Sequence, residues 1–535
     1  MTALSVPKNL ELTEPSSPDM PWVASVGNST PLRITPDLVK VLRWHQDGKV
    51  APLVEYLGFE PKEEQLNEAI ALLKKYSLLT ETGTVAEEQA RNSRLRINSL
   101  FSIQFALLNR PAQFAWLEKV ANKTFLVVIA ILNIALAIVG ILAIVLQWDV
   151  FQDALTSPQP PVAILLFFVF LIASVSIHEF AHGAVLTYFG GQVRRMGVML
   201  FYLSPAFFCD VTDAWKLQKK HQRTLVALAG VNATFGIAGL ATTVFTAAGQ
   251  SQQWLALASL ALYVGSVLNL VPFIKLDGYI ALMTHLDIPN MRAKSMEEWK
   301  KAVVILLTGK WKTLPQFSLT FALFGIAASA TPILILLALA RSVAATRAGI
   351  LSALLGATIL IVVMVLVVRG IYRVSKTQVP NSEVSTSARI WIASVSVAAT
   401  VAATSVPVPL SSVGAYWESN GELVTSLEPP STHETLVTLR RDGLFASKTL
   451  GTAVITNETV VSDMPVQALS PNIKVEGFPT KQPARRLRSY EGLELNEPGS
   501  ALFQAGFSPL GCVVIDTITL GLVTGFLSCP MQSSN

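Results

Sequence analysis

Seven long apolar stretches limit the fold of this chain more than any other feature of its sequence. A helix needs about 20 apolar residues to cross the hydrocarbon of a membrane. Hydrophobic residues make up 51% of the chain and charged residues 14%, whereas an ordinary soluble domain has roughly 25% charged residues. The sequence therefore predicts a polytopic α-helical membrane protein of about seven spans. The spans are expected at 125–148, 162–189, 224–248, 254–273, 317–340, 349–368 and 390–408.

An H-E-x-x-H sequence lies inside the second apolar stretch. His178 and His182 are four residues apart, so on a helix both imidazoles face the same side and can hold one metal ion. Glu179 follows the first histidine and is placed to act as a general base on water. Three ionisable residues in a spanning helix are costly unless a partner such as a metal ion or water compensates them. The pattern is typical of metalloproteases and predicts a zinc site within the membrane.

A third ligand is expected from elsewhere in the chain, because catalytic zinc usually has three protein ligands and one position for water. The fourth apolar stretch is followed by Leu276-Asp277-Gly278, which makes Asp277 the candidate carboxylate. Three residues between the two motifs are alternative ligands, although a solvated turn is the simpler role for them. They are Cys209, Asp210 and Asp213.

Together the two motifs resemble the site-2 protease family of intramembrane zinc metalloproteases. Its signature couples an intramembrane H-E-x-x-H with a later N-P-x-P-x-x-x-L-D-G, and the resemblance covers about 125–315. Leu270 stands where the family has its first proline, which removes no chemical group. The resemblance implies a hydrolase with zinc ligands His178, His182 and Asp277, general base Glu179, and Asn269 as the residue that polarises or orients the scissile carbonyl.

The distribution of basic residues predicts the orientation in the membrane, since Lys and Arg collect in cytoplasmic loops. The segments after the second and fourth stretches are rich in both, whereas 149–160 and 249–253 contain neither. We therefore expect a multi-pass protein of a bacterial plasma membrane, with its amino terminus in the cytoplasm and its carboxyl-terminal region outside. Both motifs then lie toward the cytoplasmic leaflet.

The segment 190–215 is too polar to span and too apolar for an ordinary loop. We expect it to dip back into the membrane as a wall of the active-site chamber, because nonhelical backbone at that depth must be buried by protein or face a watery cavity. In the resembled family, a membrane-associated hairpin after the catalytic helix presents extended substrate.

Residues 1–86 are polar and predict a small cytosolic domain. Thr35-Pro36-Asp37 is a helix start, Asp47-Gly48 a stop, 62–76 has helical spacing, and 78–85 is expected to form a hairpin. These elements make a winged-helix-like module, and its glutamates argue against nucleic acid as a partner. The stretch 34–80 resembles the PqqD-like peptide-chaperone domains, which implies a peptide-binding role. A structural dock for the membrane domain is the alternative.

The remaining segments complete the predicted domain organisation. Residues 87–124 are expected to be an amphipathic juxtamembrane linker of one or two helices, 125–315 the catalytic membrane core, 316–410 additional transmembrane helices, and 411–535 an extracytoplasmic β-rich domain. Cys512 and Cys529 either form a disulfide or remain free thiols. The run 511–528 is read as strands, with a further span as the alternative.

Three functions fit these features. The first is an intramembrane zinc metalloendopeptidase that cleaves the leader of a ribosomally made, modified precursor peptide. The second is a regulatory protease of the same chemistry that cuts a membrane-anchored signalling protein. The third is a non-hydrolytic transporter or immunity protein on the same scaffold, against which the intact Glu179 argues. Expected partners are the precursor peptide or membrane-anchored protein and the lipid bilayer.

Overall fold

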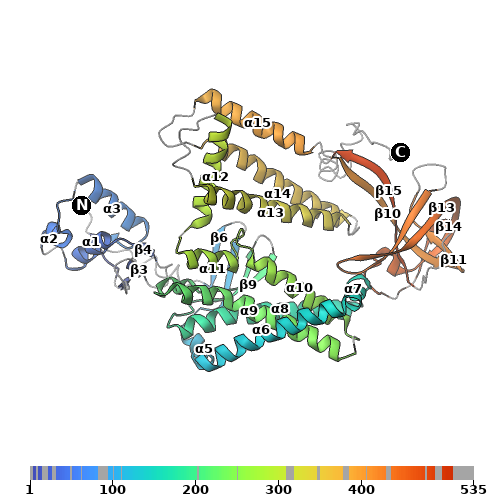
Figure 1. Cartoon of the computed structure of the whole chain (residues 1–535), viewed down its shortest axis with the longest axis horizontal. Coiled ribbons are helices and arrows are strands. Elements are labelled where there is room, and N and C mark those ends of the chain that lie inside the picture. The colour runs from blue at the N-terminus through green and yellow to red at the C-terminus, as the bar shows by residue number, and fades with distance from the viewer. Residues whose placement is uncertain are drawn as a thin grey trace.

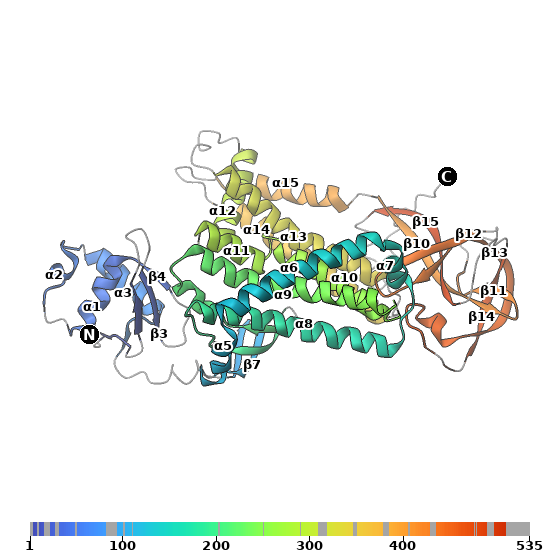
Figure 2. The same ribbon diagram turned by 60° about the horizontal axis from the view of Figure 1, so that its bottom comes forward.

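A computed structural model describes most of the 535-residue chain and shows three regions in sequence order. The amino-terminal domain and a carboxyl-terminal β-barrel lie at opposite ends of a group of long helices (Figures 1 and 2). The described residues are 4–7, 10–14, 22–26, 32–48, 51–61, 63–81, 94–99, 102–109, 111–201, 204–249, 251–288, 290–308, 318–345, 350–377, 385–404, 407–428, 435–475, 477, 479–488 and 497–509.

Within the described residues, five helices are long and apolar enough to cross a membrane, and they match the first five predicted spans within four residues at each end. They are α6 (Lys123–Leu146), α8 (Pro161–Tyr188), α9 (Lys220–Ala247), α10 (Gln253–Leu270) and the Leu319–Ala338 part of α13 (Leu319–Ala345). Helices α14 (Ile350–Ser375) and α15 (Thr386–Thr404) overlap the last two predictions but are not among these five, so the two further spans stay a prediction.

Proline and glycine set the ends of the two helices that carry the motifs. Helix α8 begins at Pro161, where the missing N–H costs nothing, and ends before Gly190, which has a φ of +86°. Helix α10 ends at Leu270 because Pro272 cannot continue it, and Val271 before the proline is extended. The short helix α11 (Asp277–Leu286) and then α12 (Met291–Thr308) follow, where the sequence reading had predicted only a basic cytoplasmic segment.

Helix α9 lies at the centre of the membrane region. Half of the residues in its most apolar stretch are buried, compared with 11% of those in α6. Helix α9 contacts α6, α8, α10 and α11. Gly140 of α6 and Gly239 of α9 let the two helix backbones meet, because a Cβ built on Gly140 would lie 2.8 Å from the Gly239 Cα. Near this crossing Asn133 donates from Nδ2 to Asn232 Oδ1 at 3.0 Å, so Asn232 makes a helix–helix hydrogen bond.

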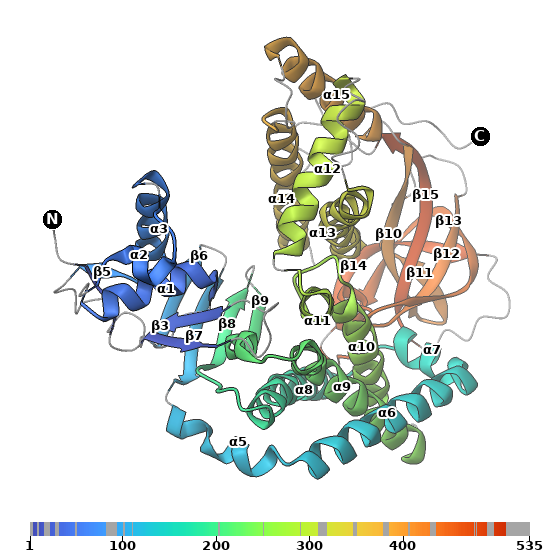
Figure 3. The same ribbon diagram turned by 60° about the vertical axis from the view of Figure 1, so that its left-hand side comes forward.

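A four-stranded antiparallel sheet combines two strands that precede α6 in the chain with two strands that follow α8. Its order is β6 (Leu95–Ser99), β7 (Ser102–Leu108), β8 (Met196–Phe201) and β9 (Ser204–Cys209). The nonhelical segment predicted after α8 is thus a hairpin, β8–β9, and Figure 3 shows the sheet facing the amino-terminal domain. The predicted amphipathic helix over 87–124 is wrong for 95–108, because pairing of β7 with β8 outweighs the local helical pattern. Among the described residues of 87–124, the helical ones before α6 begins are a 3-10 turn (Pro111–Phe114) and α5 (Ala115–Val120).

The amino-terminal domain contains the three predicted helices, but its strands differ from the prediction. Helices α1 (Pro36–Gln46), α2 (Leu53–Leu57) and α3 (Glu63–Lys75) follow an antiparallel sheet of β2 (Leu10–Thr13), β3 (Trp22–Val26) and β4 (Leu32–Ile34). In place of the predicted hairpin, β5 (Thr80–Glu81) pairs with β1 (Leu4–Ser5), since the chain before the helices supplies its partner. Residues 82–85 of that prediction lie outside the described residues.

The predicted β-rich region after the last helix is confirmed as a closed barrel. Its strand order is β10 (Pro407–Ser419), β11 (Glu422–Thr425), β14 (Thr480–Arg488), β13 (Ser447–Met464), β12 (Thr435–Asp442) and β15 (Gly499–Pro509). Closure leaves no open sheet edge. Its interior holds Tyr416, Leu439 and Ile455, each at most 1% exposed. Cys512, Cys529 and the run 511–528 lie outside the described residues.

The barrel docks on the short helix α7 (Trp148–Thr156) and the turn after it. Arg441 of β12 forms an ion pair with Asp153. Gln159 joins the barrel backbone at two points, donating to Asn472 O at 3.2 Å and accepting from Lys474 N–H at 3.0 Å. These contacts tie the barrel to the segment between α6 and α8.

Candidate metal centre

The histidines of α8 and the carboxylate of α11 meet at one point. The Nε2 atoms of His178 and His182 lie 2.9 and 3.3 Å from Asp277 Oδ2, and 3.2 Å from each other. All three side chains are largely buried, with exposures of 13%, 6% and 17%. The residues predicted as metal ligands are therefore brought together from segments almost 100 positions apart.

This arrangement fits a tetrahedral metal ion. With metal–nitrogen and metal–oxygen bonds of about 2.0–2.1 Å, the ligand atoms of tetrahedral zinc lie about 3.3 Å apart. Two of the observed separations, 3.2 and 3.3 Å, agree with that value, and the third, 2.9 Å between His178 Nε2 and Asp277 Oδ2, is shorter. Two imidazoles and one carboxylate, with a fourth direction left for water, are also a donor set of the catalytic zinc type. The donors therefore fit a zinc ion in both chemistry and spacing.

The Nδ1 atoms of both imidazoles, which point away from Asp277, contact α9. His182 Nδ1 lies 2.7 Å from the carbonyl oxygen of Val226, which can only accept, so Nδ1 donates to it and Nε2 is the nitrogen that faces Asp277. His178 Nδ1 lies 2.8 Å from Thr234 Oγ1. Such partners for the outer nitrogen are usual around metal-binding histidines.

Gly230 of α9 leaves room beside the two metal-facing nitrogens. A Cβ built on Gly230 would lie 2.4 Å from His182 Nε2 and 2.5 Å from His178 Nε2. Any side chain here would occupy the space that a metal ion needs or displace the rings. The absence of a side chain at position 230 is therefore part of the site.

Asn269 holds Asp277 through two hydrogen bonds. Its Nδ2 donates to Asp277 Oδ2 at 2.8 Å, and its Oδ1 accepts the backbone N–H of Asp277 at 3.2 Å. The second bond satisfies an N–H at the start of α11, where Leu276 gives no side-chain cap. Gly278 is needed for this approach, since a Cβ there would lie 2.2 Å from Leu270 O. The structure thus places the predicted catalytic Asn269 against a ligand; its role toward a substrate carbonyl stays a prediction.

Burial and hydrogen bonding act in opposite directions on Asp277. Burial raises the pKa of its carboxyl group, but hydrogen bonds with His178 and His182 outweigh this and hold the pKa below its usual range. The group is therefore a carboxylate at neutral pH, which is the form that binds a cation.

Glu179 lies between the metal group and the hairpin. Its carboxylate interacts electrostatically with His178, His182 and Asp277 and hydrogen-bonds with the backbone of Cys209 at the end of β9. Strand β9 is the edge of its sheet and contacts α8. The backbone N–H of Asp210 donates to the carbonyl oxygen of Arg195, on the β8 side. Because hydrogen-bonded and non-bonded residues alternate along an antiparallel strand, the backbone groups of the preceding residue, Cys209, point to the opposite side, which is the open edge of the sheet. The predicted general base thus faces an open strand edge.

The alternative ligands do not belong to the metal group. Asp210 accepts from the backbone and hydroxyl of Thr212, and Asp213 pairs with Arg194 at 2.9 Å and Lys216 at 3.0 Å. Burial raises the pKa of the Cys209 thiol well above its usual value, so this thiol stays neutral. Among the described residues, the group of side chains positioned to hold a metal is His178, His182 and Asp277.

Sequence reasoning missed the three positions of α9 that contact the histidines. Val226, Gly230 and Thr234 are spaced by four, as are His178 and His182, so one face of α9 matches one face of α8. That spacing was available in the sequence. It is not specific enough to identify a partner helix before the packing is known.

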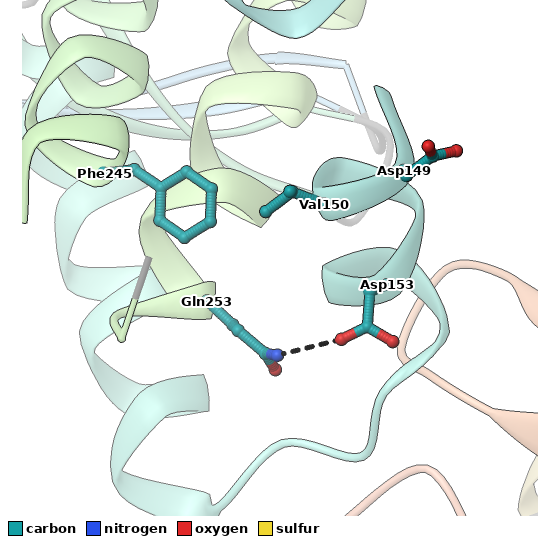
Figure 4. Close-up of a pocket in the computed structure, with 5 residues that line it drawn as sticks. All are labelled: Asp149, Val150, Asp153, Phe245 and Gln253. Atoms are coloured by element: carbon teal, nitrogen blue, oxygen red, sulfur yellow. Dashed lines mark hydrogen bonds between the residues drawn. The ribbon is translucent and has the colours of Figure 1, made fainter. Parts of the chain in front are cut away.

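A separate shallow pocket lies far along the helices, next to the docked barrel (Figure 4). It is lined by Asp149, Val150 and Asp153 of α7, Phe245 of α9 and Gln253 of α10, and the Asp149 carboxylate points away from the other four side chains. Gln253 points to Asp153, and their Nε2 and Oδ2 atoms lie 3.4 Å apart. Because Asp153 also pairs with Arg441, these polar groups serve the barrel contact.

The chain was compared with protein-family models, curated proteins and solved structures. No family model, no curated protein and no solved structure matches it.

Proposed function

We propose that the chain is an intramembrane zinc metalloendopeptidase of the site-2 protease type. The observation that carries this proposal is the meeting of His178 and His182, on the apolar helix α8, with Asp277 at the start of α11, at distances that suit tetrahedral zinc. A buried cluster of ionisable side chains in such a setting is costly without a cation to compensate it. The adjacent Glu179 adds the general base that peptide hydrolysis requires.

The residues of the chain divide the work of hydrolysis. A bound zinc ion would supply Lewis-acid polarisation of the attacking water and the peptide carbonyl. Glu179 takes a proton from the water as its oxygen adds to the carbonyl carbon, and returns the proton to the amide nitrogen as the C–N bond breaks. Asn269 fixes the Asp277 carboxylate, and in the resembled family the corresponding residue also orients the scissile carbonyl. The surrounding apolar helices limit water to the site.

The open edge of β9 supports binding of an extended substrate. Every second residue of β9 hydrogen-bonds with β8, and the residues between them turn their backbone groups outward. The outward residues are Phe207, Cys209 and Pro205, of which Pro205 has a carbonyl but no N–H. A peptide added to this edge as a strand would pass beside Glu179. The substrate backbone must be unwound from a helix to bind in this way.

The biological role that we propose is leader removal from a precursor peptide. The amino-terminal domain supports it, because Glu11 of β2 pairs with Lys216, just after β9, at 2.7 Å. Lys216 also contacts Asp213. The domain therefore lies next to the β8–β9 hairpin, whose last residue, Cys209, contacts Glu179. A peptide held by a winged-helix-like module at this position would be delivered to the open edge. The proposed setting is a bacterial plasma membrane with about seven spans, this domain in the cytoplasm and the barrel outside.

Zinc content and cleavage test the proposal together. The full chain, purified in detergent, should bind one zinc ion, and His178→Ala and Asp277→Ala should lose it. His285→Ala, which removes an exposed histidine of α11, should not. Glu179→Gln should keep zinc but lose cleavage of a single-span peptide in liposomes, since only the base is removed. A wild-type chain without zinc or cleavage would refute the proposal and favour a non-hydrolytic transporter or immunity protein.

A further inference from the structure

The turn between β12 and β13 of the barrel has two large apolar side chains at its tip. The N–H of Gly443 donates to the carbonyl oxygen of Ala446 at 2.9 Å, so Leu444 and Phe445 are the two central residues of the turn. Turn tips in contact with water usually contain Gly, Pro, Asn, Asp or Ser. A Leu-Phe pair at this place therefore indicates surroundings other than water.

Leu444 packs against two of the apolar helices. It contacts a buried cluster that includes Phe167 of α8 and Leu257 of α10, which are 4% and 1% exposed. Gly443 permits this close approach, because a Cβ built on it would collide with the carbonyl oxygen of Leu155 in the last turn of α7. The turn is thus in contact with α7 as well as with α8 and α10.

Phe445 is covered on one side and exposed on the other. Its ring centroid lies 5.7 Å from that of Phe167, while 57% of its surface is exposed. The Phe167 ring also contacts Phe168, at 5.2 Å between centroids, and Phe168 is 55% exposed on the surface of α8. Phe445 and Phe168 therefore flank the same buried ring, and the exposed surface of Phe445 adjoins the apolar surface of α8.

The position of Phe167 along α8 defines the depth that the turn reaches. Phe167 follows Pro161, the first residue of α8, by six residues, or about 9 Å at 1.5 Å per residue. Val162 and Leu165, between these two positions, are 66% and 62% exposed, so α8 presents apolar side chains from its first turn. Trp254, the second residue of α10, packs on the same cluster and is of the type that marks a membrane–water interface. Phe445 therefore lies at the level of the hydrocarbon when α8 crosses a bilayer.

We propose that the turn Gly443–Ala446 anchors the barrel in the membrane, with Leu444 docked on α8 and α10 and Phe445 inserted among lipid acyl chains beside Phe168. Acyl chains fit this surface because the exposed group is an aromatic ring without a hydrogen-bonding group and it adjoins a helix that faces lipid. The ion pair of Arg441 with Asp153 lies just before the turn and holds the polar base of the hairpin on α7. Anchoring requires only that α8 and α10 cross a bilayer, whatever the metal group does.

Photocrosslinking tests the contact of position 445 with lipid. The full chain is reconstituted in phosphatidylcholine liposomes with p-benzoylphenylalanine in place of Phe445, whose ring it resembles. The same replacement of Phe168 is the positive control. Replacement of Leu436, which is 65% exposed at the far end of the same hairpin, is the negative control. We expect phospholipid adducts at position 445, with a yield close to that at 168, and none at 436. Absence of phospholipid adducts at 445, or adducts only with a second copy of the chain, would overturn the proposal.

A second measurement tests whether the turn holds the barrel. Leu444→Ser/Phe445→Asn places ordinary turn residues at the tip, so the hairpin should still form. Leu436→Ser is the matched control, because it also removes an exposed apolar side chain from β12. In liposomes, hydrogen exchange at the Lys474 N–H, which donates to Gln159 O in the docking contact, should accelerate about tenfold or more in the double variant only. Amides of the β13–β14 pairing should keep their wild-type rates. An unchanged rate at Lys474 in the double variant would overturn the anchoring role.

Discussion

Asn269 forms hydrogen bonds with both the side chain and the backbone of Asp277. Its Nδ2 donates to Oδ2 of Asp277 at 2.8 Å, and its Oδ1 accepts from the backbone N–H of Asp277 at 3.2 Å. One amide therefore orients the carboxylate that approaches both histidines and also completes the start of α11. Asn269 lies in the last turn of α10 and Asp277 is the first residue of α11, so these hydrogen bonds close the loop between the two helices. The orientation of the Asp277 side chain is thus supported by a residue only eight positions earlier, in addition to the two histidines of α8.

Replacing Asn269 separates two roles. In Asn269→Leu both hydrogen bonds are lost at similar volume, so we expect zinc affinity to fall about 10–100-fold. The measurement is chelator competition, with thermal unfolding of the metal-free protein to check folding. Full zinc affinity with loss of peptide cleavage would contradict this and assign Asn269 to the substrate carbonyl instead.

Gly230→Ala tests the space beside the imidazoles. The added methyl group would lie about 2.5 Å from both Nε2 atoms, so we expect zinc binding to be lost or weakened by at least about tenfold. Gly265→Ala is the control, because a Cβ at that position of α10 meets no atom within 4 Å. Equal zinc content in the two variants would show that the rings do not need this space.

Cys209 should be a poorly reactive thiol. Burial, followed by the nearby Glu179 and Asp210, raises its pKa, and only the thiolate reacts with maleimide. In a Cys512→Ser/Cys529→Ser background, labelling at pH 8 should be slower by about tenfold or more than in the denatured chain. The rate should rise as the pH increases above 8. Equal rates in the folded and denatured chains at pH 8 would contradict the burial of this thiol beside Glu179.

The docking of the barrel on α7 can be loosened at one ion pair. Asp153→Asn weakens the contact with Arg441, and Asp149→Asn, on the same helix and in the same pocket, is the matched control. The pair is partly exposed, so it contributes about 1 kcal/mol or less. Hydrogen exchange at the amides of Gln159 and Lys474 should therefore accelerate by at most about fivefold, and only in Asp153→Asn. No difference between the two variants would remove Asp153 from the docking contact.

Local signals in the sequence predicted what depends on local interactions. Helix α1 begins after Thr35 and ends before Asp47, as its start and stop residues indicate. The group of His178, His182 and Asp277 was identifiable as a candidate metal site because metal ligands follow a fixed spacing and chemistry. Glu179 was placed beside them by its position in the motif alone.

What the sequence did not predict depends on partners far along the chain. Residues 95–108 alternate apolar and polar side chains in part, yet their strand character becomes evident only with β8, almost 100 residues later. The same holds for Thr234, whose contact with His178 follows from the packing of α8 on α9. Closure of the barrel also pairs strands that are distant in sequence, β10 with β15.

The sheet beside Glu179 has a consequence for the order in which the protein is made. Strands β6 and β7 are synthesised before α6, whereas β8 and β9 emerge only after α8. The first hairpin must therefore wait, unpaired on its β7 side, until two helices have entered the bilayer. Because Cys209 is the last residue of the last strand, the backbone contact to Glu179 forms at the end of this process. A ribosome-bound chain thus carries the histidine motif of α8 before the four-stranded sheet beside it can be completed.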